Sequence, residues 1–296
     1  MPSTDPGSPV SPAVQALPVF TAAGATSELL LLCPAGEPRQ LLYWLPAMGI
    51  SARHYLPLAE AMVALGVAVA LHEWRGIGSS NRRAGRRQDW AYRELLTEDL
   101  PAGLAVATQR LPQARCWLGG HSLGGQLASL YAGLHPTQAA GLALVASGAP
   151  YWRCFARSGL IRMAYVLAPW LAALCGHLPG RRIGFGGNEA RGVIRDWSRS
   201  GRSGRYRAER LDADLEQATA ALEFPLLALR MQDDWLGPVA SLDWLLSKMP
   251  RTRSTRDVLT PQDLAGRADH FSWMKAPVPV AERIAGWIAT QESAAT

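Results

Sequence analysis

The sequence predicts an α/β protein in which a mostly parallel sheet carries helices on both faces. From residue 28 onward, short apolar runs alternate with longer segments of helical period. Strands buried on both faces read as continuous apolar runs, and a helix between successive strands makes them parallel. The chain has 296 residues, of which 48% are hydrophobic and 18% charged, so it can bury a substantial core.

The expected strands are short runs rich in Leu, Val and Ala. They are residues 29–33, 41–45, 67–71, 116–118, 142–145 and 226–229, with a weaker run at 257–260.

Between the strands lie segments with the apolar spacing of a helix, at residues 53–65, 92–110, 123–135 and 241–249. In the third, Leu123, Leu127, Leu130, Tyr131 and Leu134 fall on one side, so that stripe should face the sheet. A last helix is expected from Pro279, which suits a first turn, with its buried stripe at Val280, Ile284, Trp287 and Ile288.

Two segments depart from this alternation and define the expected domain organisation. Residues 1–18, rich in Pro and Ser, are predicted to be a flexible leader without a secretory signal or anchor. Residues 148–222 lack a clear strand and predict a helical cap, or lid, inserted into the core. The core would then consist of residues 19–147 and 223–296; the alternative is ordinary extra helices packed on that core.

The longest apolar run, residues 163–175, is shorter than the roughly 20 residues that span a bilayer. We therefore expect a buried or partner-covered helix and no transmembrane segment. Four scattered cysteines, without a C-x-x-C pair, disfavour both a zinc site and a disulfide framework. Reduced thiols in a cytoplasmic protein are the resulting expectation.

The net charge of +6 is concentrated in one arginine-rich segment that also carries acidic residues. A solvated face is the favoured interpretation, and a patch for nucleic acid or an anionic surface is the alternative. No nucleic acid partner is expected, because no nucleic-acid module accompanies the arginines. They are Arg181, Arg182, Arg191, Arg195, Arg199, Arg202, Arg205, Arg207 and Arg210.

The stretch WLGGHSLGGQ, residues 117–126, places Ser122 among four glycines. Residues 120–124 fit G-x-S-x-G, between an expected strand and an expected amphipathic helix. In that context the pattern predicts a strained strand-to-helix turn that only glycine can flank and that exposes a serine nucleophile. The free N–H groups and positive dipole end of the following helix would point to the same place.

A serine hydroxyl needs a histidine to take its proton, and the histidine needs a carboxylate. In this architecture the acid and then the histidine follow the serine, each on a loop after a later strand. Of the six histidines, only His270 lies there, just before the last helix. Asp234, after the run 226–229, is the expected acid, with Asp233 as the alternate; Asp269 is disfavoured because a sequence neighbour seldom faces the histidine ring.

Acyl transfer also needs N–H donors for the oxyanion. The N–H of Leu123, directly after the serine, is one candidate. The other should lie in LPAMG, after the run 41–45; we assign it to Met48, with Ala47 or Gly49 as alternatives.

These residues resemble the α/β-hydrolase superfamily over essentially everything after residue 20. GHSLGG is similar to its nucleophile elbow, PAMG stands at its H-G-x-G oxyanion loop, EWRGIGSS at its D-x-R-G-x-G-x-S segment, and DHF at its G-H-F histidine loop. The chain most resembles the monoacylglycerol-lipase-like and serine-aminopeptidase-like bacterial hydrolases. That resemblance implies an eight-stranded sheet with a cap inserted after the strand that follows the elbow helix.

The resulting expectation is a cytoplasmic serine esterase, lipase-like, that forms an acyl-enzyme on a small-molecule ester and needs no cofactor or metal. A thioesterase or amidase/aminopeptidase would use the same triad, and a non-catalytic binding protein is the remaining alternative. The apolar part of the insertion suggests a cover over an acyl chain, or else the inside of a helical layer: Leu160, Met163, Val166, Leu167, Trp170 and Leu171. The oligomeric state is left open.

Overall fold

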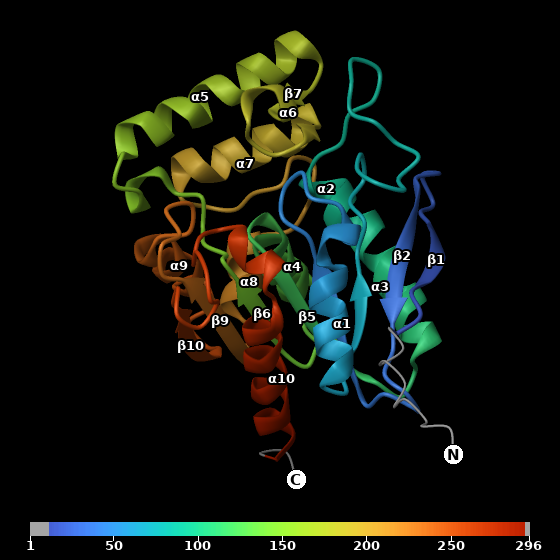
Figure 1. Ribbon diagram of the computed structural model, residues 1–296. Helices are drawn as coiled ribbons and strands as arrows, with labels where there is room; N and C mark the ends of the chain where they lie inside the picture. The colour runs from blue at the N-terminus through green and yellow to red at the C-terminus, as the bar shows by residue number, and fades with distance from the viewer. Residues whose placement is uncertain (1–11, 294–296) are drawn as a thin grey trace, which may run out of the picture.

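A computed structural model describes residues 12–293, and its centre is an eight-stranded sheet (Figure 1). The strand order is β1-β2-β4-β3-β5-β6-β9-β10. β2 runs antiparallel to β1 and β4, and all other neighbours are parallel. The predicted α/β architecture with a mostly parallel eight-stranded sheet is therefore confirmed.

Seven strands overlap the runs expected from the sequence, although β10 is mostly exposed and begins four residues before its expected run. They are β2 (Thr26–Leu32), β3 (Gln40–Leu45), β4 (Ala68–Leu71), β5 (Arg115–His121), β6 (Leu142–Val145), β9 (Pro225–Met231) and β10 (Arg253–Leu259).

The eighth strand, β1 (Gln15–Phe20), overlaps the predicted leader, which is therefore wrong for its last four residues. Val19 belongs to the core and Leu17 packs against it, so alternate side chains of this segment gain apolar contacts. Pro18 is tolerated because β1 is an edge strand, where a residue without an N–H group need not remove a hydrogen bond between strands. Residues 1–11 of the predicted leader lie outside the described residues.

Alternate residues of β3 enter two separate apolar clusters, one on each face of the sheet. Leu41, Tyr43 and Leu45 belong to one cluster, and Leu42 and Trp44 to the other. α1 (Leu56–Ala64) and α10 (Val278–Ser293) supply the second cluster, whereas α3 (Leu100–Arg110), α4 (Leu123–Leu134) and α9 (Val239–Leu246) supply the first. Helices thus cover both faces, as predicted.

The five predicted helices are all present, with local variations at their ends. The segment 92–110 contains α2 (Tyr92–Glu94), the π-helical turn η2 (Leu95–Asp99) and α3. The 3-10 turn η1 (Ala52–Tyr55) precedes α1, and η4 (Ser272–Lys275) precedes α10. Val280, Ile284, Trp287 and Ile288 are buried, which confirms the stripe of the last helix.

Between β6 and β9 the chain forms a helical layer, named the cap for its position, above the edge of the sheet where the parallel strands end (Figure 1). Its elements are η3 (Trp152–Cys154), α5 (Ser158–Cys175), β7 (Leu178–Pro179), α6 (Gly180–Ile183), β8 (Asn188–Glu189), α7 (Arg191–Ser203) and α8 (Leu215–Ala220). The short β7–β8 pair corrects the expectation that this segment lacks strands, because two residues per strand leave no apolar run. α8 packs against α4 of the core.

α5 differs from what the sequence led us to expect. Only two residues of this 18-residue helix, Tyr165 and Ala172, are buried, so the prediction of a buried helix is wrong; cover by a partner stays a prediction. Leu160, Met163, Leu167 and Trp170 are exposed, so these four do not form the inside of a helical layer. The spacing of apolar residues predicts which side chains lie on one side of a helix, but it does not predict whether that side is buried or exposed.

Candidate active site

Ser122 stands at a sharp turn between β5, which ends at His121, and α4, which begins at Leu123. Its backbone has φ 55° and ψ −120°, a conformation that residues with a side chain rarely adopt. The turn leaves the serine partly exposed between two buried neighbours. The predicted strained elbow is therefore present at the predicted residue.

The glycines around Ser122 are required by contacts with the backbone. A Cβ at Gly120 would lie 2.4 Å from the carbonyl carbon of Gly124, and a Cβ at Gly124 would lie 2.1 Å from the carbonyl oxygen of Leu45. Both separations are far below van der Waals contact. Absent side chains thus let α4 start directly against β5 and against the loop that follows β3.

Hydrogen bonds from β6 and its following loop fix the strained backbone. The N–H of Ser122 donates to the carbonyl of Val145 over 3.2 Å, and the hydroxyl of Ser147 donates to the carbonyl of Ser122 over 3.0 Å. Gly125 must lack a side chain because its Cβ would lie 2.1 Å from Ser147 Oγ. Sequence reasoning missed Ser147, which belongs to no motif.

His270 and Asp234, the predicted base and acid, are brought together after β10 and β9. His270 Nδ1 lies 2.7 Å from Asp234 Oδ2, and both side chains are buried. Asp234 Oδ1 accepts the N–H groups of Leu236 (2.9 Å) and Gly237 (2.8 Å). Because these bonds fix the carboxylate, it can hold the His270 ring in one orientation with Nε2 directed away from the acid.

The two alternative carboxylates occupy other roles. Asp233 is exposed, and its N–H donates to the carbonyl of Ala268. Asp269 Oδ1 accepts the N–H groups of Phe271 and Ser272, so it fixes the backbone between the histidine and η4.

The His270–Asp234 pair lies beside the elbow. The ring of His121, the residue before Ser122, lies 4.8 Å from the ring of His270 between centroids. Phe271 and Trp273 also pack on the His121 ring, at 5.6 and 5.2 Å. Ser122 Oγ makes no hydrogen bond within residues 12–293. The serine is placed near His270 because it directly follows His121, whose ring contacts the His270 ring.

The candidate oxyanion loop after β3 is connected to the elbow by a buried tyrosine. The N–H of Ala47 donates to Tyr55 Oη over 2.9 Å, and Tyr55 Oη lies 2.8 Å from His121 Nδ1. The N–H of Ala47 can only donate, so within the described residues His121 Nδ1 is the one acceptor for the tyrosine's own proton, and the ring proton of the neutral histidine is then assigned to Nε2. Burial, and then the neighbouring His270, lower the pKa of His121 well below its usual value, which keeps this ring neutral.

This network separates the three candidate oxyanion donors. Ala47 is occupied by Tyr55, whereas the N–H groups of Met48 and Gly49 make no hydrogen bond in the described part of the chain. The N–H of Leu123 is likewise unpaired there, as expected at the first position of a helix. The donors that the sequence assigned, Met48 and Leu123, are therefore both available.

Two residues of the EWRG segment form hydrogen bonds with the loop between β3 and α1. Trp74 Nε1 donates to the carbonyl of Pro46 over 2.8 Å, and Glu73 Oε1 accepts the N–H of Ala52 over 3.0 Å. The chain between β3 and α1 is thus fixed on both sides of Met48.

The cap reaches the candidate oxyanion loop at a contact between glycines. A Cβ on Gly49, which has a φ of +77°, would lie 2.1 Å from the nitrogen of Gly187 and 2.4 Å from the carbonyl carbon of Gly186. Glu189 Oε1 accepts the N–H of Gly187 over 2.9 Å and so holds this part of the cap. Sequence reasoning missed the contact, although the glycine-rich GFGG before Asn188 was a visible signal.

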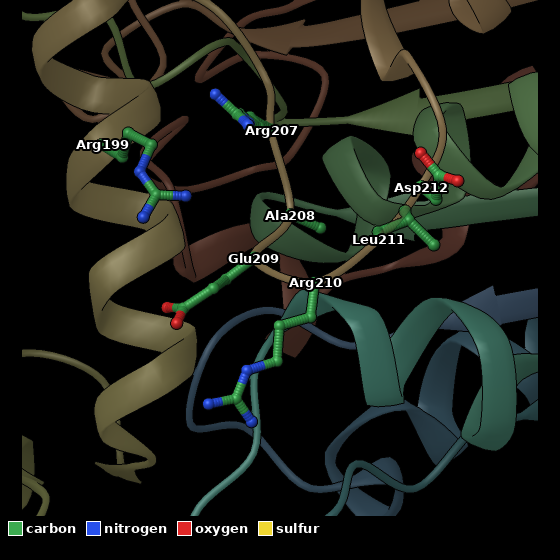
Figure 2. A pocket seen from close by; sticks show the side chains of 7 residues that line it. All are labelled: Arg199, Arg207, Ala208, Glu209, Arg210, Leu211 and Asp212. Carbon is green, nitrogen blue, oxygen red and sulfur yellow. The ribbon is translucent and has the colours of Figure 1, made fainter.

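A cavity of about 560 Å³ lies elsewhere, in the arginine-rich segment (Figure 2). Its lining includes Arg199, Arg207 and Arg210 but none of the candidate catalytic residues. Arg199 pairs with the buried Asp196, and Arg195 with Glu209. Part of the predicted solvated face is therefore neutralised by ion pairs; binding of an anionic partner there stays a prediction.

Among residues 12–293, no three His, Cys, Asp or Glu side chains gather in a way that could bind a metal ion. All four cysteines are free thiols.

Comparison with known proteins identifies the family. The family model described as serine aminopeptidase, S33, matches residues 36–196, more than half of the chain. The chain belongs to this family. A search of curated protein sequences found no match.

Solved structures with the same fold include several esterases. An esterase from Exiguobacterium antarcticum has a TM-score of 0.63 and 14% identity, covering 93% of this chain and 100% of the other. A thermophilic esterase from Thermogutta terrifontis has a TM-score of 0.60 and 18% identity, covering 93% and 98%. A Pyrococcus furiosus esterase has a TM-score of 0.59 and 13% identity, covering 95% and 93%. At these identities the likeness shows the α/β-hydrolase fold.

The steric account of the elbow predicts opposite effects for two glycine substitutions in helices. Gly124→Ala should lower the free energy of unfolding by about 1–3 kcal/mol, because its methyl group meets the Leu45 carbonyl. Gly286→Ala in α10, where a Cβ meets nothing within 4 Å, should raise it by about 0.5–1 kcal/mol. Urea unfolding measures both values, and an unchanged or more stable Gly124→Ala protein would contradict the account.

Proposed function

We propose that this family member is a serine hydrolase that cleaves carboxylic esters through an acyl-enzyme, with Ser122, His270 and Asp234 as its triad. The hydrogen bond between His270 and Asp234, beside an elbow that carries a strained serine, is the observation that carries the proposal. Family membership and the esterases of the same fold support a hydrolase.

In the proposed mechanism, His270 Nε2 takes the proton of Ser122 as the hydroxyl attacks the ester carbonyl. Asp234 stabilises the imidazolium that forms, because its carboxylate already accepts from Nδ1. The unpaired N–H groups of Met48 and Leu123, with the positive end of the α4 dipole, stabilise the oxyanion. His270 then protonates the leaving alcohol and activates the water that releases the acid. No step requires a metal or cofactor.

Adjacent aspartates provide a matched test of the triad. Ser122→Ala should abolish hydrolysis of p-nitrophenyl esters and labelling by a fluorophosphonate probe. Asp234→Asn should lower kcat by about 10⁴-fold, because the amide favours the wrong tautomer of His270. Asp233→Asn should leave kcat within about twofold, since its side chain is exposed. Equal losses for the two aspartates, or labelling that persists in Ser122→Ala, would refute the assignment.

Hydrolysis of an amide is the second candidate, because the family model is described as an aminopeptidase. The same triad would serve an ester, a thioester or an amide, so the test compares kcat/KM on three substrates with one acyl group. We expect the ester to exceed the amide by at least 100-fold, which corresponds to roughly 2.7 kcal/mol in the transition state. An amide hydrolysed as fast as the ester would favour the second candidate.

The Tyr55 network should act on catalysis through the oxyanion loop. Tyr55→Phe leaves the buried Ala47 N–H and His121 Nδ1 unpaired, so we expect kcat to fall about tenfold or more while KM changes little. Tyr206→Phe is the matched control, because its buried hydroxyl has no partner in the described residues.

Steady-state kinetics on one ester, together with urea unfolding, separate positioning from stability. A loss of stability in Tyr55→Phe without a loss of kcat would confine this tyrosine to a structural role.

A further inference from the structure

The outer face of α5 is an unpartnered apolar stripe. Its side chains recur every three or four residues along the helix and therefore share one side. Each exposes between 53% and 73% of its surface: Leu160, Met163, Leu167, Trp170 and Leu174. A contiguous apolar face of this length on a surface marks an interaction site.

The stripe does not belong to the interior of the cap. α5 packs on α7 through its opposite face, where Tyr165 lies 4.7 Å from Trp197 between ring centroids and covers Gly201. Figure 1 shows α7 between α5 and the sheet, with α5 as the outermost layer. The stripe consequently points away from the rest of the protein.

The segment that carries the stripe contains basic residues and no acidic ones. Residues 151–188 contain five arginines and no aspartate or glutamate. Three of the arginines precede or begin α5 and two follow it, and all five are exposed. None of the five forms an ion pair in the described part of the chain: Arg153, Arg157, Arg162, Arg181 and Arg182.

Aromatic side chains accompany these cations. The Cζ atoms of Arg153 and Arg162 lie over the Trp152 ring, at 4.8 and 5.5 Å from its centroid. Trp170 belongs to the stripe itself. Tryptophan and arginine together are typical of segments that lie at the boundary between lipid headgroups and acyl chains.

We propose that the protein docks on anionic lipid surfaces through α5, with the stripe inserted among the acyl chains and the five arginines on the lipid phosphates. A second copy of the chain is a poorer occupant, because pairing two stripes would bring arginines together without any acidic partner. The inference is independent of the proposed chemistry at Ser122.

The helix lies in the plane of the surface. Within residues 12–293, α5 is the one helix whose length and hydropathy would suffice to cross a bilayer. Its buried face remains occupied by α7, and Arg86 donates to the carbonyl of Leu174 near its end. A helix held along one side by its own protein can insert only its free side.

Vesicle flotation of the full chain tests the proposal. The probes are vesicles of phosphatidylcholine alone and of phosphatidylcholine with 30 mol% phosphatidylglycerol, at low and high salt. We expect the protein to float with the anionic vesicles at low salt, and high salt to weaken this binding at least tenfold.

Two pairs of variants separate the apolar and the charged contributions. Leu167→Gln/Trp170→Gln, which leaves the net charge unchanged, should lower partitioning onto anionic vesicles at least tenfold, whereas Phe20→Gln, at an exposed position on β1, should not. Arg157→Gln/Arg182→Gln should lower it about fivefold for each arginine removed. Arg39→Gln/Arg110→Gln has the same net charge at the opposite edge of the sheet and should change it less than twofold.

Unfolding midpoints and hydrolysis of a soluble short-chain ester show whether the variants remain folded. Failure of the wild-type protein to float with anionic vesicles would overturn the proposal. Equal effects of the two arginine pairs would also overturn it, because binding would then follow net charge alone. A concentration-dependent dimer that Leu167→Gln/Trp170→Gln dissociates, without any vesicle binding, would assign the stripe to a second copy of the chain.

Discussion

The strained backbone of Ser122 is the constraint on which the surrounding structure depends. A residue with a side chain adopts φ 55°, ψ −120° only when its neighbours fix it there. Here the Val145 carbonyl and the Ser147 hydroxyl fix its peptide groups, and missing side chains at Gly120 and Gly124 admit the close approach of α4. The conformation is therefore a property of three parallel strands and one helix, not of a flexible loop.

Two hydrogen-bonded chains of side chains meet at this turn. One runs from the N–H groups after β9 through Asp234 to His270, and the other from Ala47 through Tyr55 to His121. The rings of His121 and His270 are in contact, yet their surroundings differ. Only His270 has a carboxylate partner, whereas His121 is held neutral by burial and accepts a phenol proton. Two adjacent imidazoles thus have separate chemistry because of their partners.

The sequence predicts most of this arrangement, and the exceptions have physical causes. Runs of Leu, Val and Ala identify six strands because strands buried on both faces need no alternation. β10, an exposed edge strand, was predicted only in part. β1 was not predicted, because this edge strand is half exposed and directly follows a Pro- and Ser-rich segment. The order serine, acid, histidine selects Ser122, Asp234 and His270, because parallel strands end at one edge. Tyr55 could not be selected, since its partner His121 is 66 residues away and only the fold brings them together.

The contact of Gly49 with Gly186 and Gly187 has a consequence for how the cap and the core can change. These three residues have hydrogen atoms in place of side chains, so the backbone after β3 and the backbone of the cap are in direct contact. Any larger residue at position 49 must push the cap away from the loop that carries Met48. The distance between the cap and the core is therefore set by backbone atoms, and one added methyl group at position 49 is enough to increase it.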